Sequence, residues 1–123
     1  MADVRVVIVD DQEPYRRAMT AVVEETEGFV VVASATSGEE SLGAVARLRP
    51  DLVLMDVHLP GLDGIATSRL LIEAPYRPVV VLLSTYDEDQ FDLADSGASS
   101  YVAKATFGPD RLSEAWENAV PTH

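Results

Sequence analysis

Cysteine is absent from the sequence and basic residues are scarce, and both facts narrow the range of functions. Without cysteine the chain forms no disulfide, offers no thiolate to a metal and has no cysteine nucleophile. Only 9 Lys and Arg stand against 21 Asp and Glu, which gives a formal net charge of −12. Because so acidic a surface repels phosphate backbones, we expect this segment to make no direct contact with nucleic acid.

Long apolar runs are missing as well. No run approaches the roughly 18 apolar residues that a membrane helix needs, and the N-terminus lacks the pattern of a secretion signal. We therefore expect a cytoplasmic protein that contacts no membrane. With 123 residues, of which 47% are hydrophobic, the chain is long enough to fold as a single domain, residues 1–123, around its own core.

Short apolar runs rich in valine alternate with segments of helical period. Strands are predicted at residues 4–9, 29–34, 52–55, 79–83 and 100–104. Helices are predicted from Pro14, after a cap at Ser37, over 64–74, over 88–96 and from Pro109. The inner stripe of the first helix is predicted to be Tyr15, Ala18, Met19, Val22 and Val23. This alternation predicts an α/β fold, a doubly wound, five-stranded parallel sheet with five helices covering both faces.

Chemically reactive side chains stand at the carboxyl ends of four of the five predicted strands. They are Asp10 and Asp11 after the first strand, Asp56 after the third, Ser84 after the fourth and Lys104 at the end of the fifth. Parallel strands bring their carboxyl ends to one edge of the sheet, where such sheets bind ligands. Each residue alone is weak evidence, since turns are rich in acids and hydroxyls. A random surface rarely gathers all of them, so we expect one site.

Three carboxylates at this edge would repel one another. Two like charges about 4 Å apart cost roughly 4 kcal/mol at an effective dielectric of about 20. A hard divalent cation relieves this repulsion, and Mg²⁺ suits a site made of oxygen ligands. With the cation in place, a carboxylate can attack phosphorus and form an aspartyl phosphate. Asp56 is the best candidate for this nucleophile because it stands alone on the central strand.

Four stretches that carry these residues resemble the receiver domain of two-component response regulators. They are VVIVDDQEPYR, PDLVLMDVHLPGLDG, VVVLLST and GASSYVAK, and the resemblance covers essentially the whole chain. It implies a flavodoxin-like sheet of strand order 2-1-3-4-5, with the three aspartates at the point where the order reverses. It also implies a phosphoprotein of a phosphorelay rather than an enzyme, which assists its own phosphorylation and slow self-dephosphorylation.

The resemblance assigns a role to each site residue. Asp56 would accept the phosphoryl group from a histidine kinase. Asp11, Asp56 and the backbone carbonyl of His58 would bind Mg²⁺ directly, while Asp10 would act through water. At the phosphoryl group, Ser84 would close on one oxygen and Lys104 would neutralise the charge. Tyr101 matches an aromatic switch residue of the family, although an ordinary strand aromatic would look the same.

Two further positions are expected to affect how long the phosphoryl group lasts. His58 and Tyr86 occupy the places that tune dephosphorylation in this family, and their bulk would hinder an attacking water molecule. An exposed loop histidine with little effect remains the alternative for His58.

The resemblance also predicts the output surface. The face made by the fourth helix, the fifth strand and the fifth helix would contact a downstream protein, the chain's own C-terminal output domain, or a second copy in a homodimer. Asp89, Asp92 and Asp95 lie in this region. These acids either belong to an ordinary face exposed to water or bind a cationic surface, which would be that of a partner or of a second copy that contributes bases such as Arg111.

Other functional classes fit the sequence less well. A magnesium-dependent phosphatase with an aspartate nucleophile would have a second acid two residues later, where this chain has His58. A nucleotide-binding domain would have a glycine-rich phosphate loop after the first strand, and none is present. The intact site argues against a receiver fold that has lost phosphorylation. Whether the domain stands alone or precedes a DNA-binding portion is left open.

Overall fold

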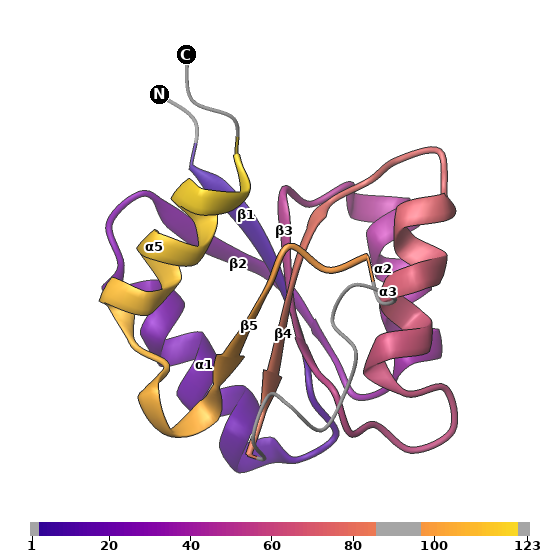
Figure 1. Cartoon of the computed structure of the whole chain (residues 1–123), viewed down its shortest axis with the longest axis horizontal. Helices are drawn as coiled ribbons and strands as arrows, with labels where there is room; N and C mark the ends of the chain where they lie inside the picture. Colours follow the sequence, from indigo (N-terminus) through magenta and orange to yellow (C-terminus); the bar gives the residue numbers. More distant parts are fainter. Residues whose placement is uncertain (1–2, 86–96, 121–123) are drawn as a thin grey trace.

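The computed structural model describes residues 3–85 and 97–120, and its elements follow the predicted alternation (Figure 1). The strands are β1 (Val4–Val9), β2 (Phe29–Ala35), β3 (Leu52–Asp56), β4 (Val79–Ser84) and β5 (Ser100–Ala103). The helices are α1 (Glu13–Glu25), α2 (Gly38–Leu48), α3 (Gly64–Glu73) and α5 (Pro109–Ala119), with a 3-10 turn η2 (Lys104–Thr106). Within the described ranges no helix is long and apolar enough to cross a membrane. The described residues thus hold four of the five predicted helices, while the one predicted over 88–96 lies outside them.

All five strands are parallel and lie in the order β2-β1-β3-β4-β5, which confirms the predicted topology. From β1 the chain passes to β2 on one side and then crosses back to β3 on the other side of β1. Loops that leave β1 and β3 therefore diverge at the carboxyl edge, and this opens a crevice between them.

Helices cover both faces of the sheet, so each strand buries residues on both sides (Figure 1). Val6 and Ile8 of β1 pack with α1 and α5, whereas Val7 and Val9 pack with α2 and α3. Every residue of β3 is buried. This explains why the central strands read as continuous apolar runs instead of alternating with polar residues.

The inner stripe predicted for α1 is only partly correct. Met19 and Val23 are buried, and Val22 packs partly buried against the same core. Ala18 is exposed, and Tyr15 is only half-buried. Tyr15 lies in the first turn of α1, directly after the β1–α1 turn, so it stands near the carboxyl edge of the sheet instead of over the sheet.

Two turns place the last residues of the site. β5 ends at Ala103, one residue earlier than predicted, because Lys104 begins the turn η2. The Phe107 N–H closes this turn by donating to the Lys104 carbonyl at 3.3 Å. α2 ends at Leu48 and is followed by the C-cap residue Arg49, whose φ of 48° is left-handed, and Pro50 then leads into β3. The chain therefore leaves α2 sharply and enters the central strand.

Candidate phosphoacceptor site

Three carboxylates meet at the carboxyl edge of the sheet, where β1 and β3 are neighbours. Asp10 and Asp11 directly follow β1, and Asp56 is the last residue of β3. One oxygen from each carboxylate lies within 4.8 Å of the others, with Asp10 and Asp56 buried and Asp11 exposed. This arrangement confirms that the three acids come together, and oxygen ligands at such spacing suit a hard divalent cation.

The ammonium group of Lys104 lies between two of these carboxylates. Its Nζ is 2.6 Å from Asp10 Oδ2 and 3.4 Å from Asp56 Oδ1. The lysine side chain is only 8% exposed, so water screens these ion pairs weakly. The ring of Tyr15 covers the ammonium from another side, with its centroid 3.7 Å from Nζ. Among the described residues, the site thus holds three acids and one buried base.

The turn between β1 and α1 fixes the position of Asp10. The Gln12 backbone N–H donates to Asp10 Oδ1 at 2.9 Å, and the Arg16 guanidinium donates to the Asp10 carbonyl oxygen at 2.8 Å. Asp10 is completely buried. A buried carboxylate with two partners, an ammonium and a backbone N–H, has a restricted orientation. The turn therefore holds one acid rigidly while its neighbour Asp11 remains accessible.

The loop from β3 to α3 is held close to Asp56 by the backbone. The Val57 N–H donates to the Leu83 carbonyl at 2.9 Å, and the Gly64 N–H donates to the Val57 carbonyl at 2.9 Å. A Cβ at Gly64 would collide with the Asp56 carbonyl oxygen and lie 2.8 Å from Val57 Cα. Asp63 caps α3 by accepting a backbone N–H of its first turn at 2.8 Å. Only glycine fits at 64, and the close packing anchors the end of β3.

The pKa of the Asp56 carboxyl is raised above its ordinary value, chiefly because the group is buried. Lys104 lowers this pKa by attraction, Asp10 raises it by repulsion, and a hydrogen bond from the His58 backbone lowers it. Loss of solvation therefore outweighs the help from the lysine. A divalent cation beside Asp56 would favour its ionised, nucleophilic form.

A small cavity of about 210 Å³ leads to Asp56. Its lining consists of Gln12, Tyr15, Asp56, His58, Thr85 and Lys104. A shallower hollow of about 590 Å³ lies on the side of Asp11 and the 57–61 loop. The inner cavity is smaller than the roughly 300–1,000 Å³ of pockets that hold drug-sized ligands, so it suits a small group such as a phosphoryl.

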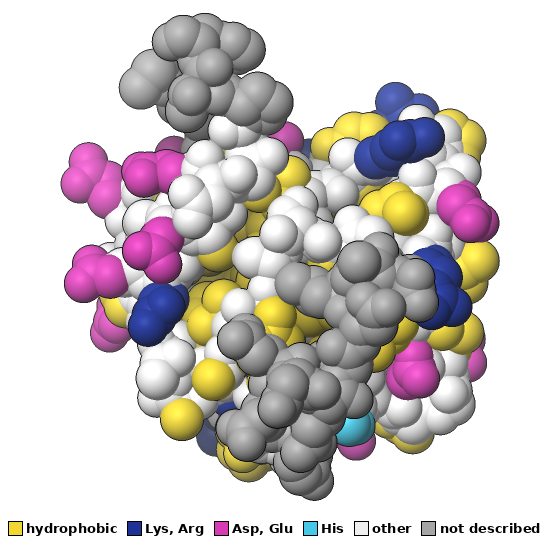
Figure 2. All heavy atoms as spheres, in the orientation of Figure 1, with side chains coloured by type: hydrophobic (Ala, Val, Ile, Leu, Met, Phe, Trp, Pro, Cys, Tyr) yellow, Lys and Arg dark blue, Asp and Glu magenta, His cyan; other side chains and the backbone are white. Residues whose placement is uncertain are grey.

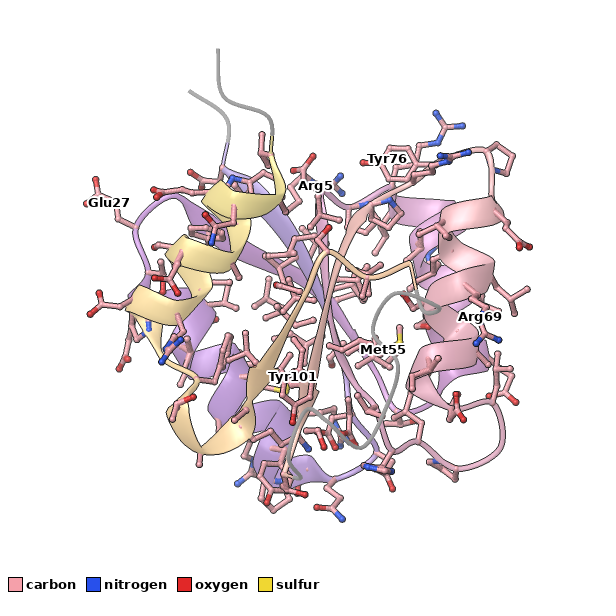
Figure 3. All side chains as sticks on the ribbon, viewed as in Figure 1. Arg5, Glu27, Met55, Arg69, Tyr76 and Tyr101 are labelled. Carbon is pink, nitrogen blue, oxygen red and sulfur yellow. The ribbon has the colours of Figure 1, made fainter. Side chains whose placement is uncertain are left out.

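The remaining predicted residues lie at the same edge, in different settings. Ser84 is buried at the end of β4 and pairs in register with Ala103, the residue before Lys104. His58 is exposed on the loop after Asp56. Figure 3 shows Tyr101 on β5 near the carboxyl edge, and its half-buried side chain packs against the core on the α2–α3 side. Tyr86 lies outside the described residues.

Sequence reasoning missed three residues that shape the site. Helical periodicity assigns Tyr15 to the core stripe of α1, yet its ring faces Lys104. Gln12 and Arg16 hold Asp10 through hydrogen bonds that no residue type predicts. The one available signal was position, because all three lie within six residues of Asp10.

A family model for the response regulator receiver domain matches residues 6–117, which include every residue of the site. The chain belongs to this family. The receiver domain is the module of two-component systems, and an acidic pocket that binds Mg²⁺ and a phosphorylated aspartate are typical of it. The acidic cluster of this chain, Asp10, Asp11 and Asp56, corresponds to such a pocket.

Several curated proteins are similar to this receiver domain. Response regulator GacA of Pseudomonas viridiflava is 39% identical over 103 residues, which cover 82% of this chain and 48% of that protein. The positive alginate biosynthesis regulatory protein of Pseudomonas aeruginosa is 35% identical over 115 residues, 93% of this chain and 46% of that protein. A protein-glutamate methylesterase/protein-glutamine glutaminase of Geobacter sulfurreducens is 37% identical over 109 residues, 88% of this chain and 29% of that protein. The chain spans about half the length, or less, of these relatives.

Solved structures agree with the fold. A LuxR-family two-component response regulator from Aurantimonas sp. has a TM-score of 0.83 and 30% identity, covering 94% of this chain and 84% of that one. The signal receiver domain of the response regulator NarL from Mycobacterium tuberculosis has a TM-score of 0.88 over 97% of this chain and 98% of that one. Its identity is 24%, so it supports the fold alone.

Proposed function

We propose that residues 1–123 form one receiver domain, which accepts a phosphoryl group on Asp56 from the phosphohistidine of a histidine kinase. The observation that carries this proposal is the cluster of three carboxylates within 4.8 Å, with buried Lys104 against two of them. The domain is a cytoplasmic phosphoacceptor and not an enzyme. It assists only its own phosphorylation and a slow self-dephosphorylation.

Asp56 is the nucleophile of the proposed reaction. One carboxylate oxygen forms a bond to phosphorus while the phosphorus–nitrogen bond of phosphohistidine breaks, and the departing imidazole takes up a proton. Asp11, Asp56 and the His58 carbonyl would hold Mg²⁺ directly, and Asp10 would hold it through water. The ion supplies positive charge that stabilises the phosphoryl oxygens and offsets the crowding of the acids.

Lys104 and Ser84 contact the transferred group in this proposal. The lysine lies 3.4 Å from Asp56 Oδ1, so a short movement brings its ammonium to a phosphoryl oxygen. Ser84 ends β4, the strand next to β3, and its hydroxyl would close on another phosphoryl oxygen. When the Ser84 hydroxyl moves, the side chain of Tyr101 on β5 would turn further inward and change the surface formed by β5 and α5. Phosphorylation would thus bias a two-state equilibrium, with a coupling of about 1–3 kcal/mol.

The output surface is proposed to include β5 and α5, while the fourth helix predicted for this surface, over 88–96, lies outside the described residues. Figure 2 shows acidic side chains gathered around α5. The exposed residues of α5 include the acids Asp110, Glu114 and Glu117. Arg111 of the same helix forms an ion pair with Glu114 at 3.7 Å. This surface suits a downstream protein, a C-terminal output domain or a second copy of the chain. The acids Asp89, Asp92 and Asp95 lie outside the described residues.

Phosphorylation with a small donor tests the proposal. The protein is incubated with acetyl phosphate and Mg²⁺, and its intact mass is measured alongside Asp56→Asn. Asp63→Asn is the matched control, because Asp63 lies on the same loop and asparagine also caps a helix. Wild type and Asp63→Asn should gain one phosphoryl group, and Asp56→Asn should gain none. EDTA should abolish the gain. An unmodified wild type, or modification of Asp56→Asn, would refute the proposal.

A further inference from the structure

We propose that Tyr15 is a positioning residue for the phosphoryl-transfer site, because its ring holds the ammonium of Lys104 against the carboxylates. The proposal rests on the function proposed above and adds a residue to it. The contact that carries it is the 3.7 Å distance between Lys104 Nζ and the centroid of the Tyr15 ring.

The ammonium has three neighbours in three directions. Asp10 Oδ2 is 2.6 Å away, Asp56 Oδ1 is 3.4 Å away, and the aromatic face forms the third wall. The face of an aromatic ring carries partial negative charge, so it attracts a cation and excludes water without competing as a hydrogen-bond acceptor. Lys104 is therefore directed to its two carboxylates, although a lysine side chain is intrinsically flexible.

The ring is itself held in place by the turn that holds Asp10. Tyr15 lies in the first turn of α1, directly after Pro14, and the next residue, Arg16, donates to the Asp10 carbonyl at 2.8 Å. The ring and the acid therefore belong to one rigid turn. Lys104 comes from η2, at the other side of β3, so Tyr15 links the two halves of the site.

This arrangement matters for the transfer step because the lysine must leave Asp10 for the phosphoryl oxygen on Asp56. The ring lines the same cavity as Asp56 and Lys104, so the ammonium can move between the two acids while it stays on the aromatic face. Without the ring, water would enter that side, and the lysine would sample orientations that point away from the incoming group. The predicted consequence is slower phosphorylation.

Two substitutions distinguish the contribution of the aromatic ring from the contributions of the hydroxyl group and of side-chain size. Tyr15→Phe keeps the aromatic face, whereas Tyr15→Leu keeps an apolar side chain without it. We expect Tyr15→Leu to lower the second-order rate constant for acetyl phosphate about five- to thirtyfold, the range for a desolvated cation–π contact. Tyr15→Phe should retain the rate within about twofold. Tyr76→Leu is the control, because Tyr76 bonds the Pro50 carbonyl at the far end of the sheet and should keep the wild-type rate.

A second measurement uses the metal-free protein and does not depend on the reaction. The ring current of Tyr15 should shift the NMR signals of the Lys104 side-chain methylene next to the nitrogen upfield in wild type and in Tyr15→Phe. In Tyr15→Leu these signals should return towards those of a solvated lysine. A structural role for the tyrosine elsewhere in α1 would not move them.

Several results would overturn the inference. They are an unchanged rate in Tyr15→Leu, an equal loss in Tyr15→Phe, an equal loss in Tyr76→Leu, or unshifted Lys104 signals in wild type. Failure of wild type to accept a phosphoryl group at all would instead refute the proposed function, and the NMR comparison would still decide whether the ring holds the lysine.

Discussion

Asp56→Asn should stabilise the metal-free protein at neutral pH by about 2 kcal/mol. Burial is the largest cost of the Asp56 charge, because the loss of solvation of a carboxylate costs several kcal/mol. Asp10, whose carboxylate oxygen lies within 4.8 Å, repels the charge by roughly 3.5 kcal/mol, and Lys104 at 3.4 Å attracts it by about 5 kcal/mol, both at an effective dielectric of about 20. The lost solvation and this repulsion together exceed the attraction to Lys104 by about 2 kcal/mol. Asp11 is exposed, so water screens its charge and it adds little to this cost. The amide retains the shape of the side chain, and Lys104 keeps Asp10 as its partner.

The pH dependence follows from the raised pKa of Asp56. Since the carboxyl has a higher pKa in the folded chain than its ordinary value of 3.8, folding favours the protonated form. Ionisation therefore lowers the stability of wild type as the pH rises from about 3.8 through the folded pKa. The advantage of Asp56→Asn should grow across this window and stay constant above it. Below the ordinary value the two proteins should differ little.

Urea unfolding in EDTA, followed by circular dichroism, measures this difference. The expected gain corresponds to a rise of about 8 °C in Tm for a domain of this size. Adding Mg²⁺ should stabilise wild type much more than Asp56→Asn, which would narrow or reverse the gap. Asp63→Asn controls for the loss of an exposed aspartate and should change little. A less stable Asp56→Asn in EDTA would mean that the attraction to Lys104 dominates, and the reasoning that lost solvation outweighs it would be wrong.

Three other predictions concern the start of α3 and the lifetime of the phosphoryl group. Gly64→Ala should destabilise the protein by about 3 kcal/mol in urea unfolding because its Cβ meets backbone, whereas Gly43→Ala, where the added atom meets nothing within 4 Å, should be neutral or stabilising. Asp63→Ala should lose about 1 kcal/mol of stability with the cap of α3, and an unchanged unfolding midpoint would contradict that role. The double variant His58→Asn, Tyr86→Glu should hydrolyse its aspartyl phosphate several-fold faster than wild type, as followed by the decay of the phosphorylated mass. An equal or longer lifetime would refute the idea that bulk at these positions excludes water.

The sheet and the location of the site could be predicted from the sequence because both depend on local patterns. Runs such as Leu52–Asp56 are apolar throughout, as strands buried on both faces must be, and the alternation with helices requires parallel strands. Once the strands are parallel, their carboxyl ends share one edge, so Asp10, Asp56, Ser84 and Lys104 had to lie near one another. The family resemblance then supplied the strand order.

The contact between Tyr15 and Lys104 could not be predicted in this way. Helical periodicity assigns a residue to a face of its own helix, but it does not say where the first turn stands relative to the sheet edge. That position depends on the β1–α1 turn and on hydrogen bonds from Gln12 and Arg16, which join particular atoms. For the same reason the sequence showed Lys104 near three acids, but not that it lies closer to Asp10 than to Asp56.

The ion pair between Asp10 and Lys104 joins residues 94 positions apart in the chain. During synthesis the acids leave the ribosome early, whereas the base emerges only when the fifth strand has been made. A nascent or shortened polypeptide therefore carries the acceptor carboxylate without its counter-charge. Under the proposed function, only a chain that has been completed and folded can accept the phosphoryl group, so incomplete chains would not be phosphorylated.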